Sequence, residues 1–451
     1  MGERSKFSGK IGFIMAAASS AVGLGNLWRF PYLAAKYGGA VFLFVYVLLA
    51  VTFGFTLMVT EIAIGRKTGK NVYDAYGLLD KRFKLLGVCG FLVPLIITPY
   101  YCVVGGWVVK YFVGYVTGAG KAMADSSYFG SFIGSVWPPI TCTLIFIIFT
   151  SVVVALGVEK GIEKFSKILM PILILLSIGL AVYVMFIPGS GAGFAYYLMP
   201  DFSKFSFKTV IAAMGQLFYS LSLGMGIMVT YGSYMKKEDG IESCSRHIEI
   251  FDTLVAFLAG MIIVPAVYTF SGEDESQLGQ GAGLMFVTLP KVFENMRCGT
   301  LIGALFFLLV FFAAITSSIS LMEAIVAVVI EKMHMKRKAA TALVTVACIL
   351  IAIPSELGFN IWSEVKLLGF DFLDFFDFIS NSVMMPIIEC ITCIMVGYFL
   401  HTKVIEDEIE RSGDKFRARG MYVVMIKYVA PVLLVMIFVS AVLNALGIAT
   451  L

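Results

Sequence analysis

The chain has 451 residues, of which 59% are hydrophobic and only 14% are charged, and its mean hydropathy is +0.91. This composition excludes an ordinary soluble globular protein and indicates a chain that crosses a membrane several times. The net charge of +4 implies no nucleic-acid partner, and the eight cysteines do not form the pattern of a secreted disulfide framework.

Eleven segments are long and apolar enough to cross a membrane, which takes about 20 residues per helix. The predicted spans cover residues 11–35, 40–65, 88–116, 136–157, 164–187, 206–235, 246–270, 299–331, 338–354, 367–400 and 421–448. We find no soluble domain beside them. The sequence therefore predicts an all-α polytopic membrane protein, with residues 1–451 forming a single transmembrane domain.

Lys and Arg are distributed unequally between the two sets of loops. If the N-terminus is inside, 24 of these residues lie in cytoplasmic loops and 7 in external loops. Because positively charged loops stay on the cytoplasmic side, we expect a cytoplasmic N-terminus in a multi-pass protein of the cell membrane. An odd number of spans then places the C-terminus outside.

Two spans contain a Gly-x-Gly break near their centres, "VGLGN" at 22–26 and "SLGMG" at 222–226. Glycine permits an unwound turn, and unpaired backbone at membrane depth persists only where it lines a cavity. Interrupted helices in corresponding positions of two halves indicate a secondary transporter with inverted repeats. Ordinary helix packing through glycine is the alternative. The expected repeats cover about 11–187 and 206–400, followed by an extra helix at about 421–448.

Three motifs carry a family resemblance: "AVGLGNLWRFPY" at 21–32, "GQLFYSLSLGMG" at 215–226 and "FFAAITSSIS" at 311–320. Together they resemble the neurotransmitter:sodium symporters, in particular their eleven-span prokaryotic amino-acid branch. The resemblance implies a 5+5 inverted-repeat fold with broken helices 1 and 6. It also implies symport of Na⁺ with a small-molecule amino acid across the bilayer of a prokaryotic cell, and no obligate protein partner is evident.

The resemblance further implies two sodium sites. The first site, Na1, would use the carbonyl of Ala21 with the side chains of Asn26, Ser220 and Asp252, and the second site, Na2, would use the carbonyls of Ser19, Val22 and Ala313 with the hydroxyls of Thr316 and Ser317. The alternative for these hydroxyls is hydrogen bonding back to their own helix.

Asp252 departs from the chloride-dependent members, which carry Asn at this position and Ser where this chain has Ala256. A carboxylate within a membrane is costly and usually functional. We expect its fixed charge to do the electrostatic work of chloride, so that transport has no chloride requirement.

Gly23 stands where monoamine members carry Asp, so the substrate is expected to bring its own carboxylate, as an α-amino acid does. Tyr101 would donate to that carboxylate, and Tyr219 would cover the pocket. Met225 lies between two glycines and replaces a Phe of the leucine carrier, which indicates a roomy pocket for hydrophobic or aromatic L-amino acids. The implied substrate residues are Ser20, Ala21, Gly23, Gly25, Ile97, Tyr101, Phe218, Tyr219, Ser220, Ser222, Gly224, Met225, Ser318 and Leu321. A packed aromatic patch is the alternative for "PYYCVV" at 99–104.

The family pattern also implies gates on both sides of the membrane. The outer gate would consist of Arg29, Gln216 and an acid of the tenth span, with Asp374 favoured and Asp377 as the other candidate; the inner gate would consist of Arg4, Phe7, Tyr234 and Glu331. Gly161 and Pro171 match an element at which helix 5 unwinds. We expect the buried Glu61 to cap broken backbone as a structural group.

Other classes of protein fit the sequence less well. An intramembrane enzyme would need a catalytic constellation, but the three histidines, at 247, 334 and 401, all lie near the cytoplasmic face and no catalytic motif occurs. The main alternative is a sodium-independent or proton-coupled amino-acid carrier of the same fold. A channel or receptor built on this scaffold is a further alternative.

Overall fold

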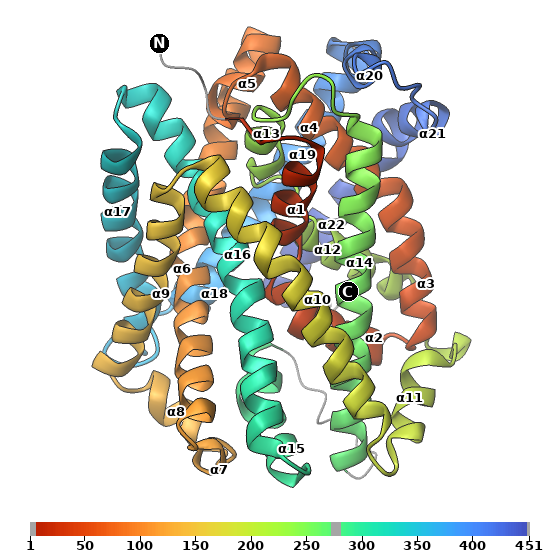
Figure 1. The fold of residues 1–451 in the computed structure, drawn as a ribbon. Coiled ribbons are helices and arrows are strands. Elements are labelled where there is room, and N and C mark those ends of the chain that lie inside the picture. The colour runs from red at the N-terminus through yellow and green to blue at the C-terminus, as the bar shows by residue number, and fades with distance from the viewer. Residues whose placement is uncertain (1–5, 272–280, 449–451) are drawn as a thin grey trace.

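The computed structural model describes residues 6–271 and 281–448, which form an upright bundle of helices (Figure 1). The all-α class predicted from the sequence is confirmed. The helices are α1 (Lys10–Ala21), α2 (Phe30–Lys36), α3 (Ala40–Leu49), α4 (Phe55–Thr68), α5 (Val72–Leu79), α6 (Lys84–Val116), α7 (Gly120–Met123), α8 (Tyr128–Ile133), α9 (Trp137–Ala155), α10 (Lys164–Met185), α11 (Ser190–Leu198), α12 (Phe207–Ser220), α13 (Ile227–Gly232), α14 (Ile241–Phe270), α15 (Leu289–Asn295), α16 (Gly299–Met333), α17 (Arg337–Leu357), α18 (Phe372–Asp377), α19 (Met385–Ile394), α20 (Lys403–Glu410), α21 (Arg419–Val424) and α22 (Ala430–Ala445).

Within the described ranges, nine helices are long and apolar enough to cross a membrane. A tenth span forms if α1 is joined to the bent segment Gly25–Lys36. The predicted sixth span is divided into α12 and α13, each too short to cross alone. The arrangement is consistent with the eleven predicted spans, while the division into two repeats stays a prediction.

The ends of several spans differ from the hydropathy prediction. The third span already begins at Lys81, because its polar first residues continue the helix beyond the apolar stretch that hydropathy detects. The tenth span begins later than predicted, at Phe372. There the side chain of Asp371 caps the helix by accepting a hydrogen bond from the Asp374 amide at 2.8 Å.

The two Gly-x-Gly segments break their helices as predicted. The chain leaves α1 at Ala21 and resumes a helical course at Gly25, bent by 52°. Between α12 and α13, Ser222, Gly224 and Gly226 have φ values of 55°, 73° and 69°. This left-handed conformation cannot continue a right-handed helix, so the backbone unwinds for one turn.

Close packing through glycine holds α4 against α13, beside the second break. A Cβ atom on Gly65 would lie 1.9 Å from the Val229 carbonyl oxygen, and one on Gly232 would lie 2.3 Å from the Ile62 carbonyl oxygen. The two backbones are therefore in direct contact, which is typical of small residues between membrane helices. This contact positions α13 and with it one edge of the break.

We predict that Gly65→Ala lowers the stability of the protein by about 1–3 kcal/mol, because the methyl group must push α13 away from α4. Thermal unfolding followed by intrinsic fluorescence measures this change. Gly179→Ala is the matched control, since Gly179 lies within α10 and has no atom within 4 Å of its would-be Cβ. An equal loss of stability in both variants would contradict the prediction.

Candidate functional site

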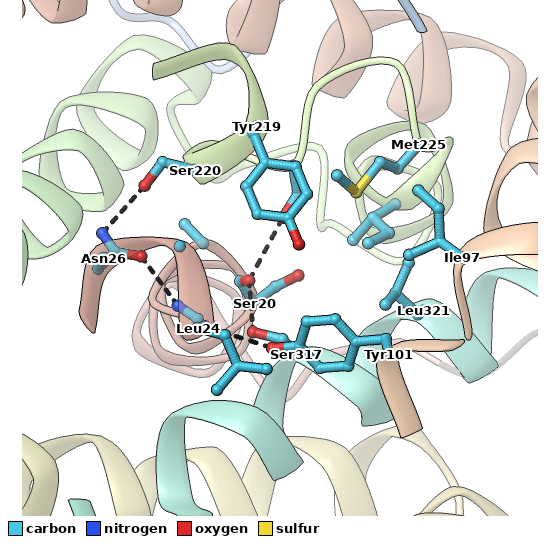
Figure 2. Close-up of a pocket in the computed structure, with 15 residues that line it drawn as sticks. Ser20, Leu24, Asn26, Ile97, Tyr101, Tyr219, Ser220, Met225, Ser317 and Leu321 are labelled. Atoms are coloured by element: carbon cyan, nitrogen blue, oxygen red, sulfur yellow. Dashed lines mark hydrogen bonds between the residues drawn. The ribbon is translucent and has the colours of Figure 1, made fainter. Parts of the chain in front are cut away.

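A cavity with about 340 Å³ of empty space lies between the two helix breaks (Figure 2). The residues that line it are Ser20, Ala21, Gly23, Leu24, Gly25, Asn26, Ile97, Tyr101, Tyr219, Ser220, Ser222, Met225, Ile227, Ser317 and Leu321.

The wall of the cavity has a polar and an apolar part. Figure 2 shows Asn26 and Ser220 on one side, and Ile97, Met225 and Leu321 gathered on the other. Such a division suits a ligand that has a charged end and an apolar side chain.

Three predicted substrate residues do not line this cavity: Phe218, Gly224 and Ser318. The Ser318 hydroxyl instead bonds to the Ile315 carbonyl and to the hydroxyl of Thr150 in α9, both at 2.9 Å. It therefore faces away from the cavity, contrary to the prediction. The lining residues Leu24 and Ile227 were not predicted, because their apolar side chains look like ordinary span residues.

The glycines of the first break let the chain pass close to its neighbours. A Cβ on Gly23 would lie 2.8 Å from the Ser317 hydroxyl and 3.2 Å from the Tyr101 hydroxyl. A Cβ on Gly25 would lie 2.9 Å from the ring of Tyr219. Any side chain at these positions would displace the polar wall. Glycine is therefore required here for lack of space, in addition to permitting the unwound backbone.

Asp252 gathers the residues predicted for Na1. The Asn26 amide donates to Asp252 Oδ1 at 2.8 Å, and the Ser220 hydroxyl donates to the same oxygen at 2.7 Å. Tyr46, which the sequence analysis missed, donates its hydroxyl to Asp252 Oδ2 at 3.0 Å. Ala21 lines the adjoining cavity. Four elements far apart in the chain thus meet around one carboxylate.

The carboxylate of Asp252 has no solvent exposure, and no basic side chain pairs with it in the described part of the chain. A buried charge without a counter-charge is costly. The carboxylate and the Ser220 and Tyr46 hydroxyls are oxygen ligands of the kind that hard cations prefer, and the Asn26 amide oxygen, which accepts from the Gly23 amide at 3.0 Å, is a further one. The donor set therefore fits a small monovalent cation.

A second group of oxygens lies where α16 meets the end of α1, at the position predicted for Na2. The Ser317 hydroxyl reaches the Ser20 carbonyl at 3.0 Å and the Val22 carbonyl at 3.3 Å. Thr316 bonds back to its own helix, at the carbonyls of Phe312 (2.9 Å) and Ala313 (3.1 Å), as the alternative allowed.

The Ser317 hydroxyl bonds to the carbonyl of Ser20, and the part of the Ser19 carbonyl in Na2 stays a prediction. The Ser19 hydroxyl lies 2.8 Å from that of Ser166 in α10. Sequence reasoning did not point to Ser166. Its contact ties the end of α1 to α10.

At the end of the cavity nearer α2, the acid on which Arg29 acts electrostatically is Asp377 rather than the favoured Asp374. Arg29 acts electrostatically on Asp377 and on Tyr219, whereas the charges near Asp374 are Asp371, Asp377 and Lys366. Asp377 Oδ1 also accepts a hydrogen bond from the Tyr100 hydroxyl at 3.1 Å.

Gln216 does not hold Arg29 by a hydrogen bond in this structure. Its amide nitrogen donates to the Gly25 carbonyl at 3.0 Å and so satisfies one backbone group freed by the first break. A glutamine side chain at this position can bind either Arg29 or a freed backbone carbonyl, and the sequence alone does not distinguish these two roles.

At the opposite end of the cavity, Phe7 is buried against the end of α13, where its amide donates to the Tyr234 carbonyl at 3.2 Å. The Tyr234 hydroxyl bonds to Glu323 at 2.8 Å, and Glu323 forms an ion pair with Arg337. Neither charged residue was predicted, although a Glu inside an apolar span is a signal that could have indicated it.

Two further inner-gate predictions concern Arg4 and Glu331. Arg4 lies outside the described residues. Glu331 lies 3.6 Å from the amine of Lys70.

The predicted unwinding element of helix 5 is helical in this structure. Gly161 lies in a wide helical turn, Val158–Glu163, that leads into α10, and Pro171 lies inside α10. A Cβ on Gly161 would lie 2.2 Å from the Val153 carbonyl oxygen of α9. The unwinding itself stays a prediction.

The fold and the site define a class of protein. Two interrupted membrane helices face each other across a small cavity, and a buried carboxylate, Asp252, lies against its lining residues Asn26 and Ser220. This combination is characteristic of secondary transporters.

Comparisons with known proteins identify the family. The model of the sodium:neurotransmitter symporter family matches residues 4–121 and 129–449. The chain is 34% identical to the uncharacterized sodium-dependent transporter YhdH of Bacillus subtilis (strain 168), with 98% of each chain covered. It is 32% identical to an uncharacterized sodium-dependent transporter of Haemophilus influenzae, with 97% of this chain and 98% of the relative covered.

Among solved structures, the chain is similar to MhsT in complex with L-phenylalanine, at 35% identity and a TM-score of 0.87, covering 97% of this chain and all of MhsT. The chain therefore belongs to the sodium:neurotransmitter symporter family, and it is a multi-span membrane transporter and not an enzyme. The family and the fold inferred from the sequence motifs are confirmed.

Proposed function

We propose that this protein is a sodium-coupled symporter that imports hydrophobic and aromatic L-amino acids by alternating access and needs no chloride. The observation that carries the proposal is Asp252, a fully buried carboxylate beside the cavity between the helix breaks, which accepts hydrogen bonds from Asn26, Ser220 and Tyr46 and has no basic partner among the described residues. The N-terminus lies in the cytoplasm and the C-terminus outside, in agreement with the distribution of Lys and Arg.

Sodium binds at two places in this proposal. At Na1 it completes the oxygen cluster of Asn26, Ser220 and Asp252, and the carboxylate of the amino acid supplies a further ligand. Each of the two guests then binds more tightly in the presence of the other, which is the linkage that symport requires. At Na2, Ser317 and the carbonyls at the end of α1 hold a second ion.

The substrate lies along the division between the two parts of the cavity. Its carboxylate faces Tyr101, whose hydroxyl is 3.4 Å from the Leu24 amide, and its amino group faces the Ser222 hydroxyl and the freed carbonyls. Its side chain lies against Ile97, Met225 and Leu321. MhsT binds L-phenylalanine, and its similarity to this chain supports an apolar or aromatic substrate here as well.

A fixed negative charge at Asp252 supports independence from chloride. The Na1 cluster already carries the anion that would neutralise a bound sodium ion, and burial keeps that charge close to the ion. The proton-coupled alternative uses the same residue, because a buried carboxylate can accept a proton instead of Na⁺. Ion replacement distinguishes the two functions.

We predict that proteoliposomes containing the protein accumulate labelled Leu, Phe, Tyr or Trp under an inward Na⁺ gradient. Replacing Na⁺ by choline should abolish uptake, and replacing Cl⁻ by gluconate should leave it unchanged. Uptake driven by a pH gradient in the absence of Na⁺ would favour the proton-coupled carrier. Strong competition by Gly or Ala with none by the large amino acids would contradict the proposed substrate class.

We predict that Asp252→Asn weakens sodium-dependent uptake at least tenfold, about 1.4 kcal/mol or more, because it removes the charge that holds the Na1 ion. The concentration of Na⁺ that gives half-maximal uptake measures the effect. Glu356→Gln is the control, since Glu356 is a buried carboxylate of α17 that bonds to Thr143 away from the cavity. An unchanged sodium dependence in Asp252→Asn would refute the assignment.

We further predict that Asp377→Asn impairs transport more than Asp374→Asn does. In this proposal Arg29 and Asp377 close the outer end of the cavity above Tyr219, and neutralising Asp377 removes the attraction that favours closure. Rates of uptake, compared at equal amounts of reconstituted protein, check this order. A larger loss in Asp374→Asn would restore Asp374 as the gate acid.

A further inference from the structure

Two carboxylic side chains meet behind the break between α12 and α13. Glu61 comes from α4 and Glu389 from α19, and both have no solvent exposure. Glu61 Oε1 accepts a hydrogen bond from the Gly224 amide at 2.9 Å, which confirms that this residue caps broken backbone. Glu389 lies against the Glu61 carboxyl group and the same amide.

The rest of this carboxyl pair lacks hydrogen-bond donors. Glu61 Oε2 and both side-chain oxygens of Glu389 are buried and have no donor in the described part of the chain. The titratable groups that face the pair are Tyr76 from α5 and Cys390 and Cys393 from α19. All three are uncharged when protonated, so no described group supplies a positive charge.

Two carboxylates cannot both stay ionised at such a place, because burial and mutual repulsion both oppose the second charge. One proton placed between them removes the repulsion and supplies a hydrogen-bond donor to oxygens that otherwise have none. Metal binding explains the pair less well, since no cluster of three or more metal-ligating side chains occurs in the described residues.

We propose that Glu61 and Glu389 form a proton-binding site that holds one shared proton at neutral pH. Glu389 carries the proton and donates it to Glu61 Oε2, because Glu61 already accepts from the Gly224 amide and is the better place for the negative charge. The bound proton stays in the pair and is not part of the sodium and substrate sites proposed above.

The site has a structural consequence for the cavity. Gly224 has a left-handed φ of 73°, and a Cβ placed on it would lie 3.1 Å from the Met385 carbonyl oxygen in α19. The protonated pair therefore joins α4, α19 and the unwound turn. The residue that follows Gly224 is Met225, which lines the cavity, so the shared proton helps to hold the wall that contacts the substrate.

Infrared spectroscopy of the purified full chain at neutral pH tests this site without any transport measurement. The carbonyl stretch of a carboxylic acid should lose the intensity of one group in Glu389→Gln and also in Glu61→Gln, because an amide then supplies the donor and the remaining carboxyl group ionises. Glu406→Gln is the control and should leave this band unchanged, since Glu406 is already paired with Arg419 at 2.7 Å.

A second measurement covers the case in which a variant does not fold. Wild-type protein labelled with ¹³C at the side-chain carboxyl of Glu should show the acid band at neutral pH and lose it as the pH is raised. Thermal stability should fall over the same pH interval, since loss of the proton leaves two like charges in contact. Absence of a glutamic acid band at neutral pH, or a band unchanged in both Gln variants, would overturn the proposal. Neither outcome bears on sodium-coupled uptake, which is tested separately.

Discussion

The structure depends on one constraint, that backbone groups within a membrane must find hydrogen-bond partners in the protein itself. Two helices are interrupted, at Val22–Leu24 and Leu221–Gly226, and their backbone groups lose hydrogen-bond partners within the helix. Surrounding side chains supply partners instead. Gln216 binds the Gly25 carbonyl, Ser317 binds carbonyls at the end of α1, and Glu61 binds the Gly224 amide. The polar centre of the protein follows from these compensations.

The same groups that repair the breaks also create the chemistry of the centre. Oxygens that bond to freed backbone can turn toward an ion, and the buried charge of Asp252, which no basic side chain among the described residues neutralises, makes a cation the complementary guest. In an environment of low dielectric constant a few oxygens suffice, because each acts at close range without competing water. A sodium-dependent transporter can therefore bind its ion mainly through backbone and side-chain oxygens at the helix breaks, with few charged side chains.

Polar groups lie at both ends of the cavity, between helices that the proposed alternating access would have to separate. Arg29 acts electrostatically on Asp377 of the tenth span on one side, whereas Tyr234, Glu323 and Arg337 connect the chain after α13 with α16 and α17 on the other. Such contacts are discrete, since an ion pair is either formed or broken, and this makes them suitable for a two-state closure.

Properties that reside in a local stretch of sequence were determined by the sequence alone. Apolar length defines the spans, Gly-x-Gly defines the breaks, and a carboxylate inside an apolar helix marks Asp252 as functional. The tertiary structure alone brought Asp377 rather than Asp374 under the electrostatic influence of Arg29, turned Ser318 toward Thr150, and brought Tyr46 to Asp252 and Glu389 to Glu61. These pairings join residues on different helices, and the rotation of each helix about its axis depends on packing against all its neighbours, which periodicity in one segment does not specify.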